Sequence, residues 1–180
     1  GEVRRELDPR SAAEAKARAG AELAGAELVI ASEGSFGPHP ASPFLTCDEE
    51  WLVLWDARSG LSRAHRHVTT EVVCGGSACA QWDEVRAFAA RVPFPSHGLV
   101  LRPEPRWSPG DPVRKDLLDL DALEAAARDL LRSHGRVWVE VDLRAHRNPT
   151  RLRAIERAAH EFAAELARLC PRCGAAHFRV

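Results

Sequence analysis

A chain of 180 residues is long enough for one well-buried domain and too short for two ordinary ones. Its 25 lysines and arginines nearly balance 26 aspartates and glutamates, so no global field is available to hold nucleic acid or an anionic membrane. No apolar run reaches the roughly 18 residues of a membrane span, and the opening GEVRRELDPR lacks a signal-peptide core. Five cysteines suit a reducing cytoplasm better than a disulfide framework. We therefore expect a cytoplasmic protein without a membrane partner, whose binding to nucleic acid would have to be local.

The first third of the chain predicts a helix followed by strands. Segment 11–23 opens with the capping-box pattern SAAE and is rich in alanine, which indicates a helix that ends at Gly25. Apolar runs predict strands at 27–32, 49–56 and 65–74. The last two are joined by so short a turn that they must be antiparallel, so we expect a mixed sheet.

The rest of the chain alternates helical and strand patterns around a proline-rich surface loop at 103–114. Asn148 and Pro149 have the preferences of an N-cap and a first helical position. We predict helices at 82–92, 121–133 and 150–169 and strands at 98–102 and 136–142. The last helix should bury a stripe formed by Leu152, Ile155, Ala159, Phe162, Ala163 and Leu166. Together these patterns predict one α/β domain over 1–168, with a mixed central sheet flanked by helices, and a cysteine-bearing tail over 169–180.

The first candidate site follows the apolar run 27–32, where Glu33 begins an expected irregular loop. Polar residues at the end of such a strand are typical of sites in open α/β folds. Glu33 either ligates Mg²⁺ or caps backbone amides. Lys16, on the preceding helix, either offers its charge to a phosphate or pairs with a glutamate of the same helix. Ser35 and His39 lie further along, and His39 is held stiffly because Pro40 restricts its backbone.

The second candidate site is the segment DLRAHRNPTR, between a predicted strand and the last helix. Exposed amides at that helix start attract anions, and Arg144, Arg147 and Arg151 add fixed charge. In the alternative, Asn148 and Thr150 serve only as helix caps and the arginines face solvent.

His97 follows Phe94 and Pro95. This combination either holds a base or another flat ring, or is an ordinary turn with a satisfied histidine.

The tail carries Cys170 and Cys173 in the spacing of one zinc knuckle, with His177 as a possible third ligand. Such knuckles normally come in pairs, and no second C-x-x-C follows. We interpret the pair as half of a truncated zinc ribbon rather than as free thiols or a redox pair. We also expect the chain to lack its natural N-terminal segment.

The chain resembles an uncharacterised bacterial family, known only as a domain of unknown function. The resemblance rests on ASEGSFGPHP (31–40), FPSH (94–97), DLRAHRNPTR (142–151) and CPRC (170–173). It extends over nearly the whole chain.

Segment 11–34 is also similar to the helix and strand of the inosine triphosphate pyrophosphatase family. Lys16 and Gly34 fall on that family's lysine and glycine, and Glu33 lies one place after its paired acids. The resemblance implies an inosine triphosphatase-like fold in which Glu33 helps to hold Mg²⁺. Downstream, the segments 94–97 and 146–147 are similar, in the same order, to that family's base-pocket and base-reading motifs, which implies that His97, His146 and Arg147 contact the base. We also expect Lys16 with Arg144 or Arg151 to neutralise phosphate charge.

We therefore expect a metal-dependent hydrolase of a nucleoside triphosphate or related phosphate compound, with a homodimer as one expected assembly. The alternative is a non-enzymatic module that binds a ligand or nucleic acid and has a zinc-ribbon tail. Besides the implied residues, the expected ligand contacts are Ser35, His39, Asn148 and Thr150.

Overall fold

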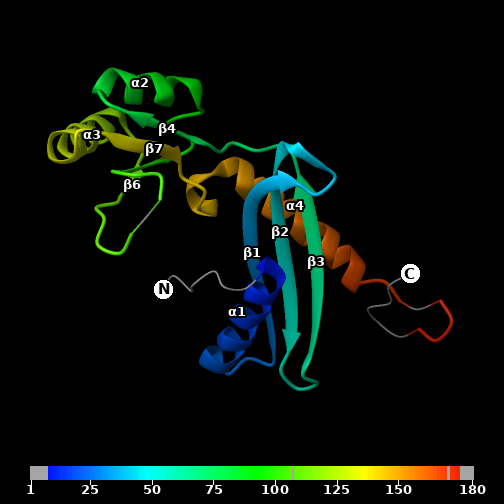
Figure 1. Cartoon of the computed structure of the whole chain (residues 1–180). Helices are drawn as coiled ribbons and strands as arrows, with labels where there is room; N and C mark the ends of the chain where they lie inside the picture. The colour runs from blue at the N-terminus through cyan, green and yellow to red at the C-terminus, as the bar shows by residue number, and fades with distance from the viewer. Residues whose placement is uncertain (1–7, 107, 170, 175–180) are drawn as a thin grey trace. The chain divides into compact units, whose positions relative to one another are not determined.

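The computed structural model describes residues 8–106, 108–169 and 171–174. Its contacts divide the chain into two compact units. The first unit is Gly1–Val72 with Arg153–Val180, and the second is Val73–Leu152. Each unit contains its own antiparallel sheet (Figure 1).

The first unit is built on a meander of three long strands, β1 (Leu28–His39), β2 (Ser42–Asp56) and β3 (Leu61–Thr69). β2 lies in the centre and pairs antiparallel with both neighbours (Figure 1). The β2–β3 turn forms because the Asp56 side chain accepts hydrogen bonds from the backbone of Arg58 and Ser59, and because Gly60 adopts a positive φ of 69°. These two strands are antiparallel, as predicted.

The expected loop after Ser32 is wrong, because β1 continues as regular strand to His39. Glu33 pairs with Trp51, and Pro38 still pairs with Thr46. A proline is tolerated there because β1 is an edge strand, where one side of the backbone needs no ladder partner. The polar residues therefore lie along a strand and not on a flexible corner.

Helix α1 (Pro9–Ala24) covers one face of this sheet. It approaches closely because its buried residues are small, and Ala13 and Ala17 pack against Val53. The helix ends at Gly25 as predicted, with the glycine at φ 62°. Its N-cap, however, is Asp8 and not Ser11, since the Asp8 side chain accepts from the Ser11 backbone N–H at 3.1 Å.

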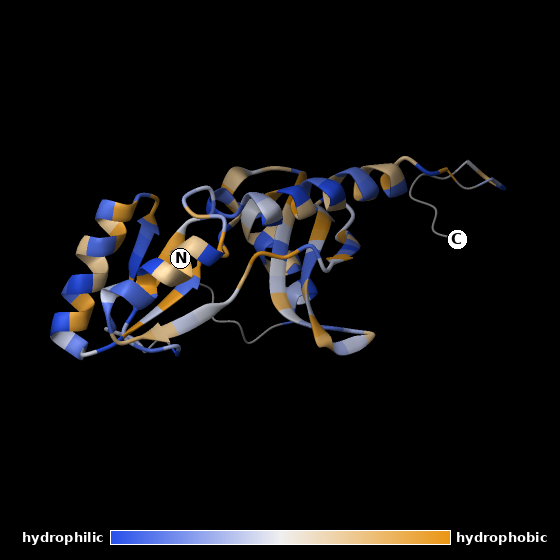
Figure 2. Cartoon of the chain, turned by 90° about the horizontal axis from the view of Figure 1, so that it is seen from above, coloured by the Kyte–Doolittle hydropathy of each residue, from blue (hydrophilic) through white to orange (hydrophobic). Residues whose placement is uncertain are grey.

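Helix α4 (Pro149–Leu166) covers the opposite face, because it packs on Leu52, whose neighbour Val53 faces α1. Much of the α4 ribbon, which leads to the C-terminus, has the blue colour of hydrophilic residues in Figure 2. Phe162 is buried as predicted, but Ala154 and Ala158 are the other buried positions. The spacing of four residues places the small alanines, rather than the predicted Ile155 and Ala159, toward the sheet.

The second unit has a four-stranded sheet in the order β4-β7-β5-β6. All its strand pairs are antiparallel. The strands are β4 (Gly76–Cys79), β5 (Leu99–Arg102), β6 (Arg114–Leu117) and β7 (Val137–Val141), and the helices are α2 (Trp82–Arg91) and α3 (Leu120–His134).

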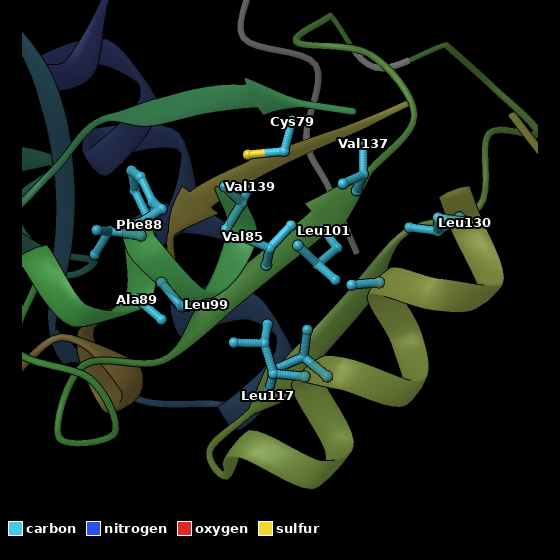
Figure 3. Packing of buried hydrophobic residues seen from close by; sticks show 13 residues of the cluster. Cys79, Val85, Phe88, Ala89, Leu99, Leu101, Leu117, Leu130, Val137 and Val139 are labelled. Carbon is cyan, nitrogen blue, oxygen red and sulfur yellow. The ribbon is translucent and has the colours of Figure 1, made fainter. Parts of the chain in front are cut away.

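Both helices of the second unit share one core with the sheet. Val85 and Phe88 from α2 and Leu130 from α3 lie in the same buried cluster as Leu101 and Val139 (Figure 3). The alternate residues of β5 and β7 that face this core are apolar, which explains why these strands were visible in the sequence. The sequence did not indicate the strands β4 and β6, because both are short, β4 consists of small residues and β6 is mostly charged.

The expected single mixed sheet is thus replaced by two antiparallel sheets in the described residues. Periodicity reveals strands but not which strands pair. None of the helices in this part of the chain is both long and apolar enough to cross a membrane.

Candidate functional site

The residues expected to form one site belong to different units. Lys16, Glu33, Ser35 and His39 lie in the first unit, whereas His97 and the segment 142–151 lie in the second.

Lys16 and Glu33 form an ion pair on the α1 face of the first sheet. The Lys16 ammonium also lies 3.4 Å from the backbone oxygen of Ser32. The short connection after Gly25 does place Lys16 beside this strand. Its charge is met by Glu33, so a phosphate or a metal ion at this point would have to compete with the pair.

Ser35 and His39 take part in the β1–β2 hairpin. Ser35 pairs with Glu49 in the ladder, and the Nδ1 atom of His39 accepts from the Ala41 backbone N–H at 3.1 Å. These contacts give both residues a structural role.

The arginines predicted to bind an anion in the second unit are engaged by protein acids. The Nε and Nη2 atoms of Arg144 donate to the Asp142 carboxylate, with Nη2 at 2.6 Å, and Nη2 also reaches Asp116 at 3.0 Å. Arg147 donates to the same Asp116 oxygen at 2.6 Å. Hydrogen bonding to Asp142 raises the pKa of Arg144, and hydrogen bonding from Arg147 lowers the pKa of Asp116. This cluster is a set of internal salt bridges.

Neighbouring polar residues fasten the start of α4. The Asn148 side chain accepts from the Arg151 backbone N–H at 3.0 Å, which confirms the predicted N-cap, and donates to the Val73 carbonyl at 2.9 Å. Arg151 donates through Nη1 to the Leu143 carbonyl at 2.7 Å. His146 is exposed at the same corner.

The FPSH segment joins this corner directly. His97 is only 5% exposed, and its Nε2 atom lies 3.0 Å from the Thr150 hydroxyl. The backbone N–H of Gly98 donates to the Arg147 carbonyl at 2.9 Å. The two sequence motifs of the second unit therefore hold each other in place.

A different site lies beside β3 in the first unit, and we call it the arginine hollow. It has a volume of about 340 Å³. Its lining includes the charged residues Arg10, Arg63, Arg66 and Glu165 and the aromatic residues Trp51 and Phe162. Sequence reasoning missed this site because its walls come from α1, β2, β3 and α4.

The three arginines of the hollow differ in their partners. Arg66 makes two hydrogen bonds of 2.9 Å to Glu49 and lies over the Trp51 ring, 5.9 Å from its centroid. Hydrogen bonding from Arg66 lowers the pKa of Glu49. The guanidinium groups of Arg10 and Arg63 have no hydrogen-bond or ion-pair partner within the described ranges. Two guanidinium groups are thus available to an anion from outside.

Behind Glu165, a chain of hydrogen bonds runs between α4 and β3. Glu165 lies 3.0 Å from the Nδ1 atom of His65, whose Nε2 atom lies 3.0 Å from Glu161. The Nδ1 atom of His67 lies 2.9 Å from the same Glu161 oxygen. His65 is 7% exposed and stacks on Phe162 with ring centroids 5.9 Å apart.

This series of hydrogen bonds did have a signature in the sequence. His65 and His67 are two residues apart on one face of a strand, and Glu161 and Glu165 are four apart on one face of a helix. Recognising it would have required knowing that α4 packs on β3.

The described residues contain no group of three or more His, Cys, Asp or Glu suited to hold a metal ion. Cys173 is exposed and is not in a disulfide. Cys170 and His177, the other expected zinc ligands, lie outside the described residues.

The fold and site define an α/β protein with two antiparallel sheets and an arginine-rich hollow at the edge of one of them. The model of the family Domain of unknown function (DUF6671) matches residues 16–180, so the chain belongs to this family. Searches of the curated proteins and of the solved structures found no match.

Proposed function

We propose that this protein binds a nucleoside triphosphate or a related phosphate compound in the arginine hollow and hydrolyses it with the help of Mg²⁺. The observation that carries the ligand class is the pair Arg10 and Arg63, two guanidinium groups with no partner in the described part of the chain. Guanidinium groups bind phosphate oxygens through paired, charge-assisted hydrogen bonds.

The size and walls of the hollow agree with this ligand class. A volume of about 340 Å³ is in the range of small-molecule sites. Trp51 and Phe162 offer apolar ring surface for a base, since bases stack readily on aromatic side chains.

The support for hydrolysis is the similarity of segment 11–34 to the inosine triphosphate pyrophosphatase family, whose fold we propose as the relative of this one. In this proposal Mg²⁺ accompanies the phosphates, because it is usually held by substrate oxygens, water and one or two carboxylates. Glu33 could bind this Mg²⁺ only after its ion pair with Lys16 is broken. Zinc binding by Cys170, Cys173 and His177 is a separate proposal about the tail.

Nucleotide binding measured by isothermal titration calorimetry tests the ligand class. We expect Arg10→Ala and Arg63→Ala each to weaken binding of a magnesium–nucleoside triphosphate by at least about tenfold, because each removes charge-assisted hydrogen bonds of about 1.5–3 kcal/mol. Arg58→Ala is the matched control, since Arg58 is 75% exposed and lies in the turn before β3. Absence of binding across a panel of triphosphates would remove the proposal.

The alternative function is a binding module without catalysis. It is favoured by the ion pair of Lys16 and Glu33, which occupies the charges expected to act on the phosphates. Release of phosphate or pyrophosphate by the protein that binds the nucleotide decides between the two, since a pure binding module releases neither.

A further inference from the structure

We infer that Glu165 is the general base of the arginine hollow and that His65 is its positioning residue. This inference rests on the proposed function, because it names the group that would activate water for attack on the bound phosphate. It concerns residues outside both sites expected from the sequence.

The first observation behind this inference is the position of Glu165. Among the described residues that line the hollow, it is the one acid, and it shares the cavity with Arg10, Arg63 and Arg66. A phosphate held by guanidinium groups would therefore lie in the same cavity as this carboxylate. General base catalysis needs a carboxylate that reaches the attacking water beside the bound substrate.

The second observation is the set of contacts that surround His65. Both its ring nitrogens lie 3.0 Å from a carboxylate oxygen, one from Glu165 and one from Glu161. The ring is buried and stacked on Phe162, so it holds the Glu165 carboxylate in a defined orientation. A base fixed by a second group, which is itself fixed by a third, is the arrangement that catalytic sites use to position a reactive group.

The proposed step is a hydrolysis. A water molecule transfers a proton to the Glu165 carboxylate while its oxygen forms a bond to phosphorus. The bond from phosphorus to the leaving phosphate oxygen breaks, and the electron pair stays with that oxygen. Arg10 and Arg63 offset the charge on the phosphate oxygens, and Glu165 afterwards releases its proton to solvent.

If these hydrogen bonds between α4 and β3 have only a structural role, the variants should behave differently. Hydrogen bonds from His65 and His67 to α4 would then only fasten the helix to the sheet. In that case the loss of Glu161, which bonds to both histidines, should matter at least as much as the loss of Glu165.

The experiment compares the variants Glu165→Gln, Glu161→Gln and Glu156→Gln in the full chain, with a magnesium–nucleoside triphosphate as substrate. We expect Glu165→Gln to lower kcat by about 100-fold or more while the Kd changes by less than about threefold. Glu161→Gln should lower thermal stability but reduce kcat by less than about tenfold. Glu156→Gln, at an exposed position of α4, should change neither.

The variant Glu165→Asp supplies a second comparison. If Glu165→Gln does not fold, Glu165→Asp keeps the carboxylate but withdraws it by one methylene, and it should give an intermediate loss of kcat.

Two results would overturn the inference and leave nucleotide binding intact. One is wild-type turnover in Glu165→Gln, and the other is nucleotide binding by the wild type without any hydrolysis. These results differ from a failure of the proposed ligand class. In that case the wild-type protein would bind none of the nucleoside triphosphates, before any variant of Glu165 is compared.

Discussion

At the scale of single residues, the partner of a charged side chain decides what that side chain can do. Arg144 and Arg147 share Asp116, and Arg144 also bonds to the buried Asp142, so their charges serve the fold. Arg63 has no such partner among the described residues. The same residue type is therefore structural in one unit and available to a ligand in the other.

The pH dependence of stability at Glu161 follows from its partners. Hydrogen bonds from His67 and then from His65 hold the pKa of Glu161 below its ordinary value of 4.5. A group whose pKa is lowered by folding stabilises the protein fully above its ordinary pKa, and this contribution is lost as the pH falls through the folded-state value.

We therefore expect Glu161→Gln to be less stable than the wild type at pH 6, and we expect this difference to shrink as the pH falls below about 4.5. Urea denaturation of both proteins between pH 6 and pH 3 measures it. Glu156→Gln serves as the control, because Glu156 is exposed on the same helix. A difference between Glu161→Gln and wild type that is constant over this range would contradict the assignment.

At the scale of elements, the pairing of two strands depends on the space that their residues leave for each other's side chains. β4 pairs with β7, and a Cβ atom added at Gly76 would lie 2.6 Å from the Trp138 ring. The Trp138 Nε1–H group donates to Glu140 at 2.9 Å, which holds the ring in place. Glycine is thus required in β4 by the tryptophan of its partner strand.

Gly76→Ala should lower the free energy of unfolding of the second unit by about 1–3 kcal/mol, because the ring must move and its hydrogen bond to Glu140 is strained. Gly37→Ala is the matched control in another strand, since nothing lies within 4 Å of its added Cβ atom. Chemical denaturation of the two variants gives the comparison, and equal effects would refute the role of Trp138.

At the scale of the whole molecule, the chain contains two units with separate apolar clusters. The core of the second unit includes Leu101, which is fully buried. The clusters of the first unit flank the sheet on its two faces, around Val53 and Leu52. A substitution that leaves a cavity in one core should therefore lower the stability of that unit more than the stability of the other.

Leu101→Ala should destabilise the second unit by about 2–5 kcal/mol. In hydrogen exchange measured by mass spectrometry, we expect faster exchange in peptides from β5 and β7 and little change in peptides from β1–β3. Uniformly faster exchange in both units would show instead that they unfold together.

The sequence by itself determined much of the local structure. Gly25 ends α1 as predicted, and Gly135 ends α3 in the same way, because a glycine adopts the left-handed conformation there at little cost. Asn148 caps α4 because its side chain reaches a backbone N–H three residues further on. These features depend on neighbouring residues only, so the local pattern is sufficient to predict them.

Tertiary structure alone decided how distant segments meet. Regular pairing with β2 turned the polar stretch after Ser32 into strand, and Arg10, Arg63 and Glu165 came to line one hollow although they are far apart in the chain. Hydrophobic periodicity tells which face of an element is buried, but the element that covers it is chosen by packing over the whole unit. Local patterns therefore predicted the helices and several of their ends, whereas the candidate site emerged only from the packing of α1 and α4 around β3.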